Sequence, residues 1–413
     1  MKTTTKYSLA LMSVIIATPV LSSHAQGGSK PAAVTSTNAY RYFVDAGAAM
    51  DVKGDELSRA LGGDGPGAAT TALTPAQRDD LVRRNAKALR LLRQGFAFSF
   101  TPPPAVNGLT PSGFFSEVAK FRALARLLRV EAQSRAAHGD WAGAANSDLD
   151  AVQLGEMCVR GGSVIAELVG NAVQAIGCVD LWEKIGHLSA AQSRQAIARM
   201  DRIARLHTPL ADVLHQEERE YLALLKVIFQ QPDWRGKFAD QILSDKSAVA
   251  LLSKIDQKTI TQGYTSYMDK LAAAARRPYS KARLEALQPS LAVLSFAAIS
   301  APTVLFDANA RTQNALLRAT LGLRIYQSEH GRYPKTLAAL TPAILRTPTT
   351  DPFSGAPLRY RLSGATYVLY SIGPDGRDDR GKAITDLHPW LERARHRVDR
   401  NSQGDIVAGV NKG

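Results

Sequence analysis

Signature sequences of the common enzyme classes are missing from this chain of 413 residues. It contains no phosphate-binding loop and no dinucleotide-binding fingerprint, and Ser163 and Ser295 lie in no nucleophile-elbow pattern. Because no set of residues has a catalytic arrangement, the sequence predicts a protein that is not an enzyme.

Histidine and glutamate residues gather in one region, but their spacing is not that of a common metal motif. Neither His-Glu-x-x-His nor Glu-x-x-His occurs around His207 and His215. His215 and Glu218 would share one helix face, and so would Glu217 and Glu220, yet charged helix surfaces often contain such pairs. A metal-dependent enzyme sited in this helical region is therefore only an alternative function.

Cysteine is scarce, since Cys158 and Cys178 are the only two. An oxidising compartment would favour a disulfide between them. If Gly161 and Gly162 form the turn of a helical hairpin, Cys178 lies about sixteen residues along the second helix, roughly 24 Å at 1.5 Å per residue, while Cys158 stays near the turn. This spacing favours two buried thiols, and a disulfide would need a different fold.

The N-terminal segment has the three parts of a secretory signal peptide. Lys2 and Lys6 precede an apolar run over residues 9–21, and small residues follow before Gln26. We expect residues 1–25 to be removed by cleavage after Ala25, which predicts a periplasmic or secreted protein. The alternative is an uncleaved anchor, for which the apolar run is short. No cysteine lies near the cleavage site, so we expect no lipoprotein, and no stable membrane span after cleavage.

Acidic residues are fewer than basic ones, 37 against 51, which gives a formal net charge of +14. Loss of the signal peptide removes two lysines and no acids, so the charge falls to +12. A basic surface favours anionic neighbours such as an envelope polymer or lipid head groups. The arginines are dispersed along helical patterns with no nucleic-acid-binding fold, so no nucleic-acid partner is expected. Ordinary solvated helix faces are the alternative interpretation.

Apolar residues recur at helical spacing through most of the chain. Residues 26–39 are rich in small residues and predict a linker, and residues 40–300 predict a helical bundle domain. Within it, Thr74-Pro75 with Gln77 has the form of a helix start. The apolar stretch 291–306 is interpreted as a buried core helix rather than a membrane helix.

From residue 304 to 395 the pattern changes to one helix followed by strands. Apolar residues at helical spacing from Asn314 end at Gly331, and Pro334 prevents the helix from resuming. Such a helix laid across a small antiparallel sheet would bury the apolar faces of both. The expected fold class is therefore mainly α with a C-terminal α+β module, followed by a flexible tail at 396–413.

Two short segments of this module have strand character. Leu358, Tyr360 and Leu362 alternate with polar residues, which indicates a half-buried strand. Ser363-Gly364 then forms a turn into residues 366–372. The pair predicts an antiparallel hairpin.

The loop that follows the hairpin is acidic and contains glycine at 373, 376 and 381. Its carboxylates come from Asp375, Asp378, Asp379 and Asp386. Oxygen ligands on a flexible loop suit a hard cation, calcium before magnesium, although the spacing is not that of an EF-hand. A solvated acidic turn without a metal is the alternative.

This C-terminal stretch resembles the globular domain of the major pseudopilins of type II secretion systems. The resemblance rests on a fixed order of short motifs, which here are Gly331-Arg332-Tyr333-Pro334, Asp351-Pro352-Phe353, Tyr370-Ser371-Ile372-Gly373, Asp375-Gly376, and Asp386-Leu387 with Trp390. It implies a pseudopilin-like head in which calcium is bound by Asp375 and Asp386 with backbone carbonyls between them. Ser371 and Asp378 complete the set of metal-site residues that we predict. Phe353 stands where that family usually has Trp, and we do not expect filament assembly.

Together these patterns predict a non-enzymatic extracytoplasmic protein with a helical binding domain and a calcium-stabilised, pseudopilin-like head. Its expected partners are a protein of the cell envelope or an anionic envelope polymer. An accessory role in a type II secretion or pilus-like machine is a further alternative.

Overall fold

The computed structural model of the chain describes residues 37–61, 72–106, 114–243, 248–289, 297–298, 300–385 and 398–412. The predicted signal peptide, most of the predicted linker and the predicted calcium ligand Asp386 lie outside these residues.

Helices make up most of the described residues, and a small sheet lies near the C-terminus. The helices of the first part are α2 (Ala39–Ala48), α3 (Glu56–Ala60), α4 (Pro75–Arg84), α5 (Ala86–Gly95), α6 (Phe114–Ala137), α7 (Trp141–Val159), α8 (Val164–Ile185) and α9 (Ala190–Ala204). Those of the second part are α10 (Leu210–Phe229), α11 (Trp234–Gln241), α12 (Val249–Leu252), α13 (Gln257–Ala275), α14 (Lys281–Ala286), α15 (Thr303–His330) and the 3-10 helix η3 (Leu337–Leu340). The strands are β1 (Arg359–Ser363), β2 (Thr366–Ser371) and β3 (Ile406–Val407), in one antiparallel sheet of order β1-β2-β3. The mainly-α fold class with a small C-terminal sheet is therefore confirmed.

Local signals define several of the helix ends. Thr74 and Ser189 each begin a helix with a capping box. The hydroxyl oxygen of each accepts a hydrogen bond from the backbone N–H of the glutamine three residues on, and the side chain of that glutamine accepts one from the backbone N–H of the Thr or Ser. Gly331 ends α15 in the left-handed conformation with φ of 69°. These helix ends follow directly from residue types, as the sequence predicted at Thr74 and Gly331.

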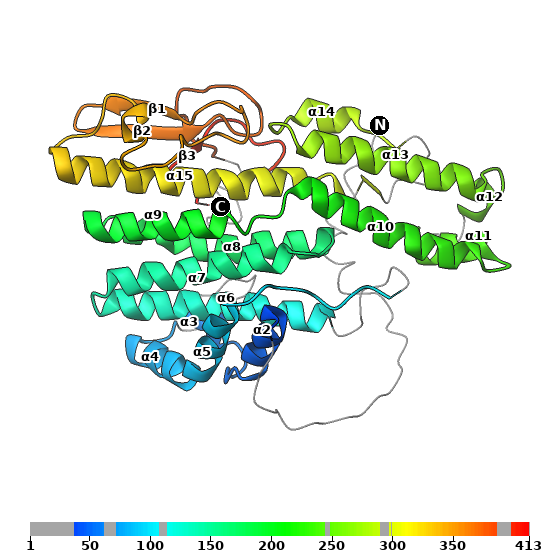
Figure 1. Cartoon of the computed structure of the whole chain (residues 1–413), viewed down its shortest axis with the longest axis horizontal. Helices are drawn as coiled ribbons and strands as arrows, with labels where there is room; N and C mark the ends of the chain where they lie inside the picture. The colour runs from blue at the N-terminus through cyan, green and yellow to red at the C-terminus, as the bar shows by residue number, and fades with distance from the viewer. Residues whose placement is uncertain are drawn as a thin grey trace.

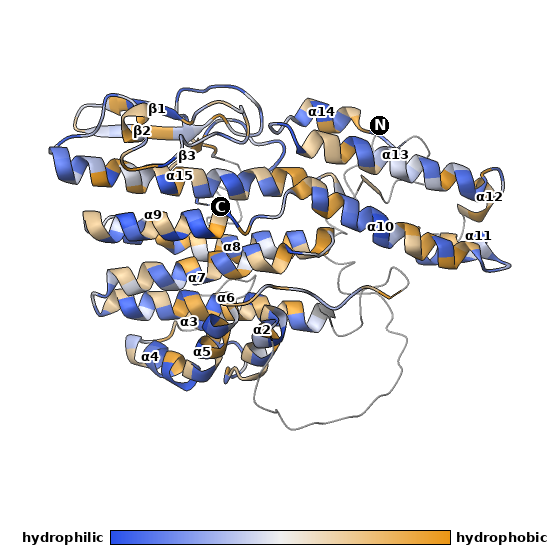
Figure 2. Cartoon of the chain, in the orientation of Figure 1, coloured by the Kyte–Doolittle hydropathy of each residue, from blue (hydrophilic) through white to orange (hydrophobic). Residues whose placement is uncertain are grey.

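The helices lie in layers, with the hairpin of α7 and α8 between α6 on one side and α15 on the other (Figure 1). Three glycines let α7 and α8 approach closely. A methyl group added at Gly155 would lie 2.6 Å from the carbonyl oxygen of Gly170, and one at Gly177 would lie 2.5 Å from that of Asp148. Hydrophilic and hydrophobic residues are interleaved along most of the long helices (Figure 2), as expected for helices with one face in solvent, whereas α7 is buried along most of its length.

Two hydrophobic clusters fill the interior. One lies among α2 to α8 and is rich in aromatic rings, with Phe43, Phe100 and Phe121 in edge or stacked contact. The other extends from Ala145 in α7 to Ile406 in β3 and includes residues of α10, α13 and α15. The predicted boundary near residues 300–304 therefore does not separate two hydrophobic cores, because α15 packs on α8 and α9 with one face and on the sheet with the other (Figure 1).

Helix α15 begins earlier than the sequence predicted. We expected a helix from Asn314 and a separate core helix over 291–306. Residues 291–296 and 299 of that core helix lie outside the described residues, and Thr303–Phe306 form the first turn of α15 itself. The hairpin is confirmed, with Ser363 opposite Thr366 and Gly364 in the left-handed region. Its first strand is less buried than expected, because Leu362 lies near the strand end and is 38% exposed.

The prediction of a flexible tail at 396–413 is wrong for the residues that the structure describes. Ile406 and Val407 pair with Ser371 and Tyr370 to add β3 to the sheet. Asn411 is buried, and its side chain donates to the carbonyl of Ile384 at 3.0 Å. This strand has only two residues, which is too short for a recognisable sequence pattern. It forms because these residues pair with β2.

The two cysteines are buried free thiols, as predicted. Burial raises the pKa of Cys178 to about 12 and raises that of Cys158 further. Among the described helices, α8 is long and apolar enough to cross a membrane, but 56% of its most apolar window is buried inside the protein. Because Cys178 and Leu181 of α8 belong to the core, packing accounts for its composition.

Candidate functional site

The turn at Asp351 is joined directly to the predicted calcium loop. Asp351 is fully buried, and its Oδ1 accepts hydrogen bonds from the Phe353 N–H at 2.9 Å and the Ser371 hydroxyl at 2.6 Å. Its Oδ2 accepts from the Ser354 hydroxyl at 2.9 Å and the Ile372 N–H at 3.3 Å. Ser371, a predicted metal ligand, is therefore a donor to a carboxylate inside the protein.

Asp375 is held by backbone donors from two segments. Its Oδ1 accepts the N–H of Arg377 at 3.1 Å, and its Oδ2 accepts the N–H of Gly404 at 3.2 Å. The second bond links the loop to the segment that leads into β3. This carboxylate therefore closes the loop against the C-terminal residues.

Asp378 faces cationic and hydroxyl groups. Its Oδ1 accepts from the Tyr370 hydroxyl at 2.9 Å and from the Arg380 N–H at 3.0 Å, and its Oδ2 lies 3.3 Å from Nε of Arg359. Burial opposes ionisation, but the bonds from Arg380 and Tyr370 outweigh it and lower the pKa of Asp378.

Asp405, just before β3, accepts hydrogen bonds from the loop, and the sequence did not indicate this role. This buried carboxylate accepts the N–H of Gly381 at 2.7 Å and that of Asp379 at 3.4 Å. Its own backbone exchanges bonds with Lys382 and Ile384, at 2.8 and 3.0 Å. Burial raises the pKa of Asp405 to about 6, against the effect of the two N–H donors.

The described loop residues do not fit a calcium cage. Calcium needs six to eight oxygen ligands that converge on one point. Here Asp375, Asp378 and Asp405 each direct their oxygens at protein N–H or O–H donors, and Ser371 directs its hydroxyl at Asp351. Hydrogen bonds hold this part of the loop in the way that a cation would, and Asp386 lies outside the described residues.

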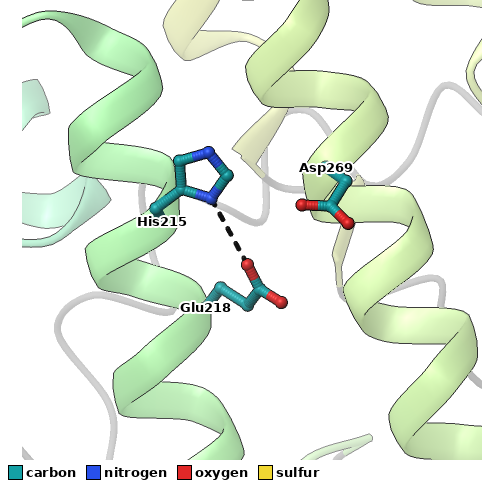
Figure 3. Close-up of side chains that lie close together, drawn as sticks. All are labelled: His215, Glu218 and Asp269. Atoms are coloured by element: carbon teal, nitrogen blue, oxygen red, sulfur yellow. Dashed lines mark hydrogen bonds and ion pairs between the residues drawn. The ribbon is translucent and has the colours of Figure 1, made fainter.

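A different group of potential ligands comes together between α10 and α13 (Figure 3). His215 and Glu218 project from one face of α10, and His215 Nδ1 lies 3.5 Å from Glu218 Oε2. Asp269 reaches toward them from α13 (Figure 3). In the part of the chain that the structure describes, this is the only group of three such side chains whose ligand atoms all lie within 4.8 Å of one another. The pairing of His215 with Glu218 was visible in the sequence, whereas Asp269 was not.

The contact with Arg276 fits the tautomer of His215 that carries its hydrogen on Nδ1. Nη2 of Arg276 lies 3.4 Å from His215 Nε2. Because a guanidinium can only donate, Nε2 is the acceptor in this contact, which leaves the hydrogen of the neutral ring on Nδ1, on the side of Glu218. The neighbouring Glu217 points elsewhere and accepts the N–H of Val164 at the start of α8 at 3.0 Å.

His207 is not part of this group. It lies between two buried carboxylates, 3.4 Å from Glu156 in α7 and 3.9 Å from Asp307 in α15. The hydrogen bond to Glu156 is the main cause of the raised pKa of His207. This histidine therefore ties α7 to α15 and shares no ligand position with His215.

A shallow groove of about 480 Å³ lies between α4, α5 and α6. Arg83, Arg90 and Arg93 line it, with Glu131 as its acidic residue. Arg93 forms an ion pair with Glu131, which a second arginine, Arg135, also contacts at 3.1 Å. Arg93 also pairs with Asp150 at 2.7 Å, and Arg83 pairs with Asp80, so among the described residues Arg90 is the lining arginine without an ion-pair partner.

No family model, curated protein or solved structure matches the chain.

The buried ionisable side chains are mainly acidic. Ten carboxylates are buried among the described residues, against one basic side chain, that of Lys184; the acids are Glu131, Asp148, Asp150, Glu156, Glu167, Asp180, Glu218, Asp307, Asp351 and Asp405. Several of these acids link two helices. Asp180 of α8, for example, accepts two hydrogen bonds from the guanidinium of Arg129 of α6, both at 2.9 Å. Since the chain already has more basic than acidic residues, this distribution leaves the excess positive charge toward solvent.

Proposed function

We propose that this chain is a non-enzymatic extracytoplasmic protein whose helical part binds an acidic polymer of the cell envelope. One observation carries the proposal: ten acidic side chains but only one basic side chain are buried among the described residues of a protein with a formal charge of +14. The solvent-facing surface is therefore more basic than composition alone indicates. Such a surface attracts flexible polyanions, and the attraction falls as salt is added.

The groove of α4, α5 and α6 is the part of this surface best suited to a polymer chain. Arg90 is exposed on α5, and Arg83, which is exposed and ion-paired with Asp80 of its own helix, lies at the C-terminal end of α4, so arginines from two helices line one groove. Guanidinium groups pair with carboxylate, sulfate or phosphate through several N–H donors at once. An open groove accepts a continuous chain more readily than a closed pocket does.

In this account the C-terminal unit has a supporting role. The sheet covers one face of α15, and the other face of α15 belongs to the same hydrophobic cluster as α8 and α9. The resemblance to pseudopilin heads supports a stable α+β unit at this position. The unit would then keep the long helices in place outside the cytoplasm.

The test is binding of the mature chain, residues 26–413, to fluorescent dextran sulfate at low and at moderate salt, with neutral dextran as the polymer control. We expect saturable binding to dextran sulfate alone. Arg83→Gln with Arg90→Gln should weaken it at least about tenfold, as expected when two charge-assisted contacts of at least about 0.7 kcal/mol each are lost.

A double variant with the same change in charge provides the matched control. Arg202→Gln with Arg205→Gln alters two exposed arginines at the end of α9 and should change binding by less than about twofold if the groove is the site. Equal weakening by both pairs would contradict the groove and leave a diffuse basic surface. Absence of binding at low salt would contradict the proposed function.

A further inference from the structure

The contact between α10 and α13 contains a nitrogen and two carboxylates from separate parts of the chain. The two helices run antiparallel. The rings of Tyr221 in α10 and Tyr264 in α13 lie 4.8 Å apart, and the side chain of Gln257, at the start of α13, donates to the carbonyl of Phe229, at the end of α10. This register brings the second half of α13 alongside the first half of α10. Asp269 is thereby placed opposite His215 and Glu218 (Figure 3).

We infer that His215, Glu218 and Asp269 form a binding site for a divalent transition-metal ion such as zinc, which links α10 to α13. An imidazole nitrogen with two carboxylate oxygens is a ligand set that zinc accepts. It differs from the predicted calcium loop in position and in chemistry, and it does not depend on the polymer-binding proposal.

The distances favour a metal over an ordinary ion pair. In a tetrahedral zinc site with bonds of about 2.1 Å, neighbouring ligand atoms are about 3.4 Å apart. The Nδ1 atom of His215 and Oε2 of Glu218 are already 3.5 Å apart, which is long for a hydrogen bond and right for two ligands of one ion. Asp269 is exposed, and its ligand atom lies within 4.8 Å of the other two.

The charges around the site also favour a cation. Within the described part of the chain, the Asp269 carboxylate has no hydrogen-bond or ion-pair partner, although it faces the largely buried Glu218. Two carboxylates that approach one another in this way repel, and a divalent ion between them removes the repulsion. Arg276 contacts His215, and no ion pair joins it to either carboxylate within the described residues.

Metal binding requires a change at His215. A metal on Nδ1 displaces the hydrogen from that nitrogen, so in the neutral ring Nε2 must carry it instead. A protonated Nε2 cannot accept from Arg276, so the arginine must leave. Because Arg276 is exposed at the end of α13, it can move into solvent. Arg276 therefore competes with the metal. Three protein ligands leave a fourth position for water.

The test is zinc binding by the mature chain, residues 26–413, without a polyhistidine tag, measured by competition with a chromophoric chelator. We expect one zinc ion per chain. His215→Gln and Asp269→Asn should each weaken binding at least about tenfold, as expected for loss of one ligand of three. Arg276→Gln should strengthen binding, which a purely structural contact would not predict.

Two control variants separate this site from general surface binding. Glu220→Gln changes a carboxylate on the same helix that pairs with Gln216, and His330→Gln changes an exposed histidine at the end of α15. Both should bind zinc as the natural chain does. Circular dichroism checks that each variant is folded, and the exposed position of Asp269 makes its variant the decisive one. Absence of stoichiometric zinc binding, or unchanged binding by Asp269→Asn, would overturn the inference.

Discussion

Replacement of Lys184 by methionine should destabilise the protein strongly, because it leaves a buried carboxylate without its cation. Lys184 of α8 and Asp148 of α7 form an ion pair at 2.7 Å, and Asp148 is completely buried. The pair is poorly directed, since neither oxygen of Asp148 has a well-formed hydrogen bond. Removing one partner of a buried pair typically costs about 3–5 kcal/mol of unfolding free energy. Lys184→Met keeps the length of the side chain, so the cost arises from the charge.

The loss should depend on pH in a defined direction. Burial raises the pKa of Asp148 from 3.8 to about 7, although Lys184 lowers it in part. In the variant this pKa must be higher still. As the pH falls from 8 to 7, folding causes Asp148 to take up a proton only in the variant, so only the variant becomes more stable. Below pH 7, Asp148 takes up the proton in both folded proteins, and both become more stable by the same amount. The destabilisation should therefore be about 1.4 kcal/mol smaller at pH 5.5 than at pH 8, the free energy of one pH unit.

Urea unfolding followed by circular dichroism at the two pH values measures these differences. The matched control is the double variant Asp148→Leu with Lys184→Met, which removes both charges and should be as stable as the natural chain or more stable. A loss below about 1 kcal/mol for Lys184→Met at pH 8 would refute the reasoning, because it would mean that the carboxylate does not depend on the pair. A double variant as unstable as the single one would refute it as well.

Three further predictions follow from packing and from the loop. Gly155→Ala should cost about 1–3 kcal/mol of unfolding free energy, because the methyl group would lie 2.6 Å from a backbone oxygen of α8, whereas Gly186→Ala, with its nearest contact at 3.6 Å, should cost much less. Cys158 and Cys178 should react with a thiol reagent only after unfolding, since both are buried with raised pKa values, and rapid reaction of the native protein would contradict their placement. Asp375→Ala should lower the melting temperature equally in chelator and in millimolar calcium, because its carboxylate accepts protein N–H donors; a loss seen only with calcium would support the calcium site instead.

The parts of the fold that the sequence predicted are those with local causes. The end of α15 at Gly331 follows from a residue that adopts the left-handed conformation without strain. The hairpin follows from alternation on either side of Ser363 and Gly364. In each case, residues within one turn or one strand determine the structure.

The parts that the sequence did not predict depend on contacts between distant residues. The two residues of β3 have no pattern of their own. Asp405 binds the loop only because the fold places its carboxylate next to the N–H groups of Asp379 and Gly381, more than twenty residues earlier in the chain. Asp269 likewise approaches His215 only through the packing of α13 on α10.

The sequence also did not show which acidic residues are buried. Acidic residues at helical spacing suggest a solvated surface, and Asp148 and Asp180 differ in no local way from exposed acids of other helices. Only the packing of α6, α7 and α8 shows that they are buried and paired with Lys184 and Arg129. The basic character of the surface could be predicted from composition, but its increase through burial of acids could not.

The most direct test of the central proposal is equilibrium binding of the mature chain to an acidic polymer at two salt concentrations. The proposal predicts saturable binding to dextran sulfate at about 50 mM salt that weakens markedly by about 200 mM, as screening shortens the range of the surface charges. Neutral dextran should not bind at either concentration. Equal affinity for the two polymers, or no binding to dextran sulfate at low salt, would contradict a protein whose basic surface serves to bind polyanions.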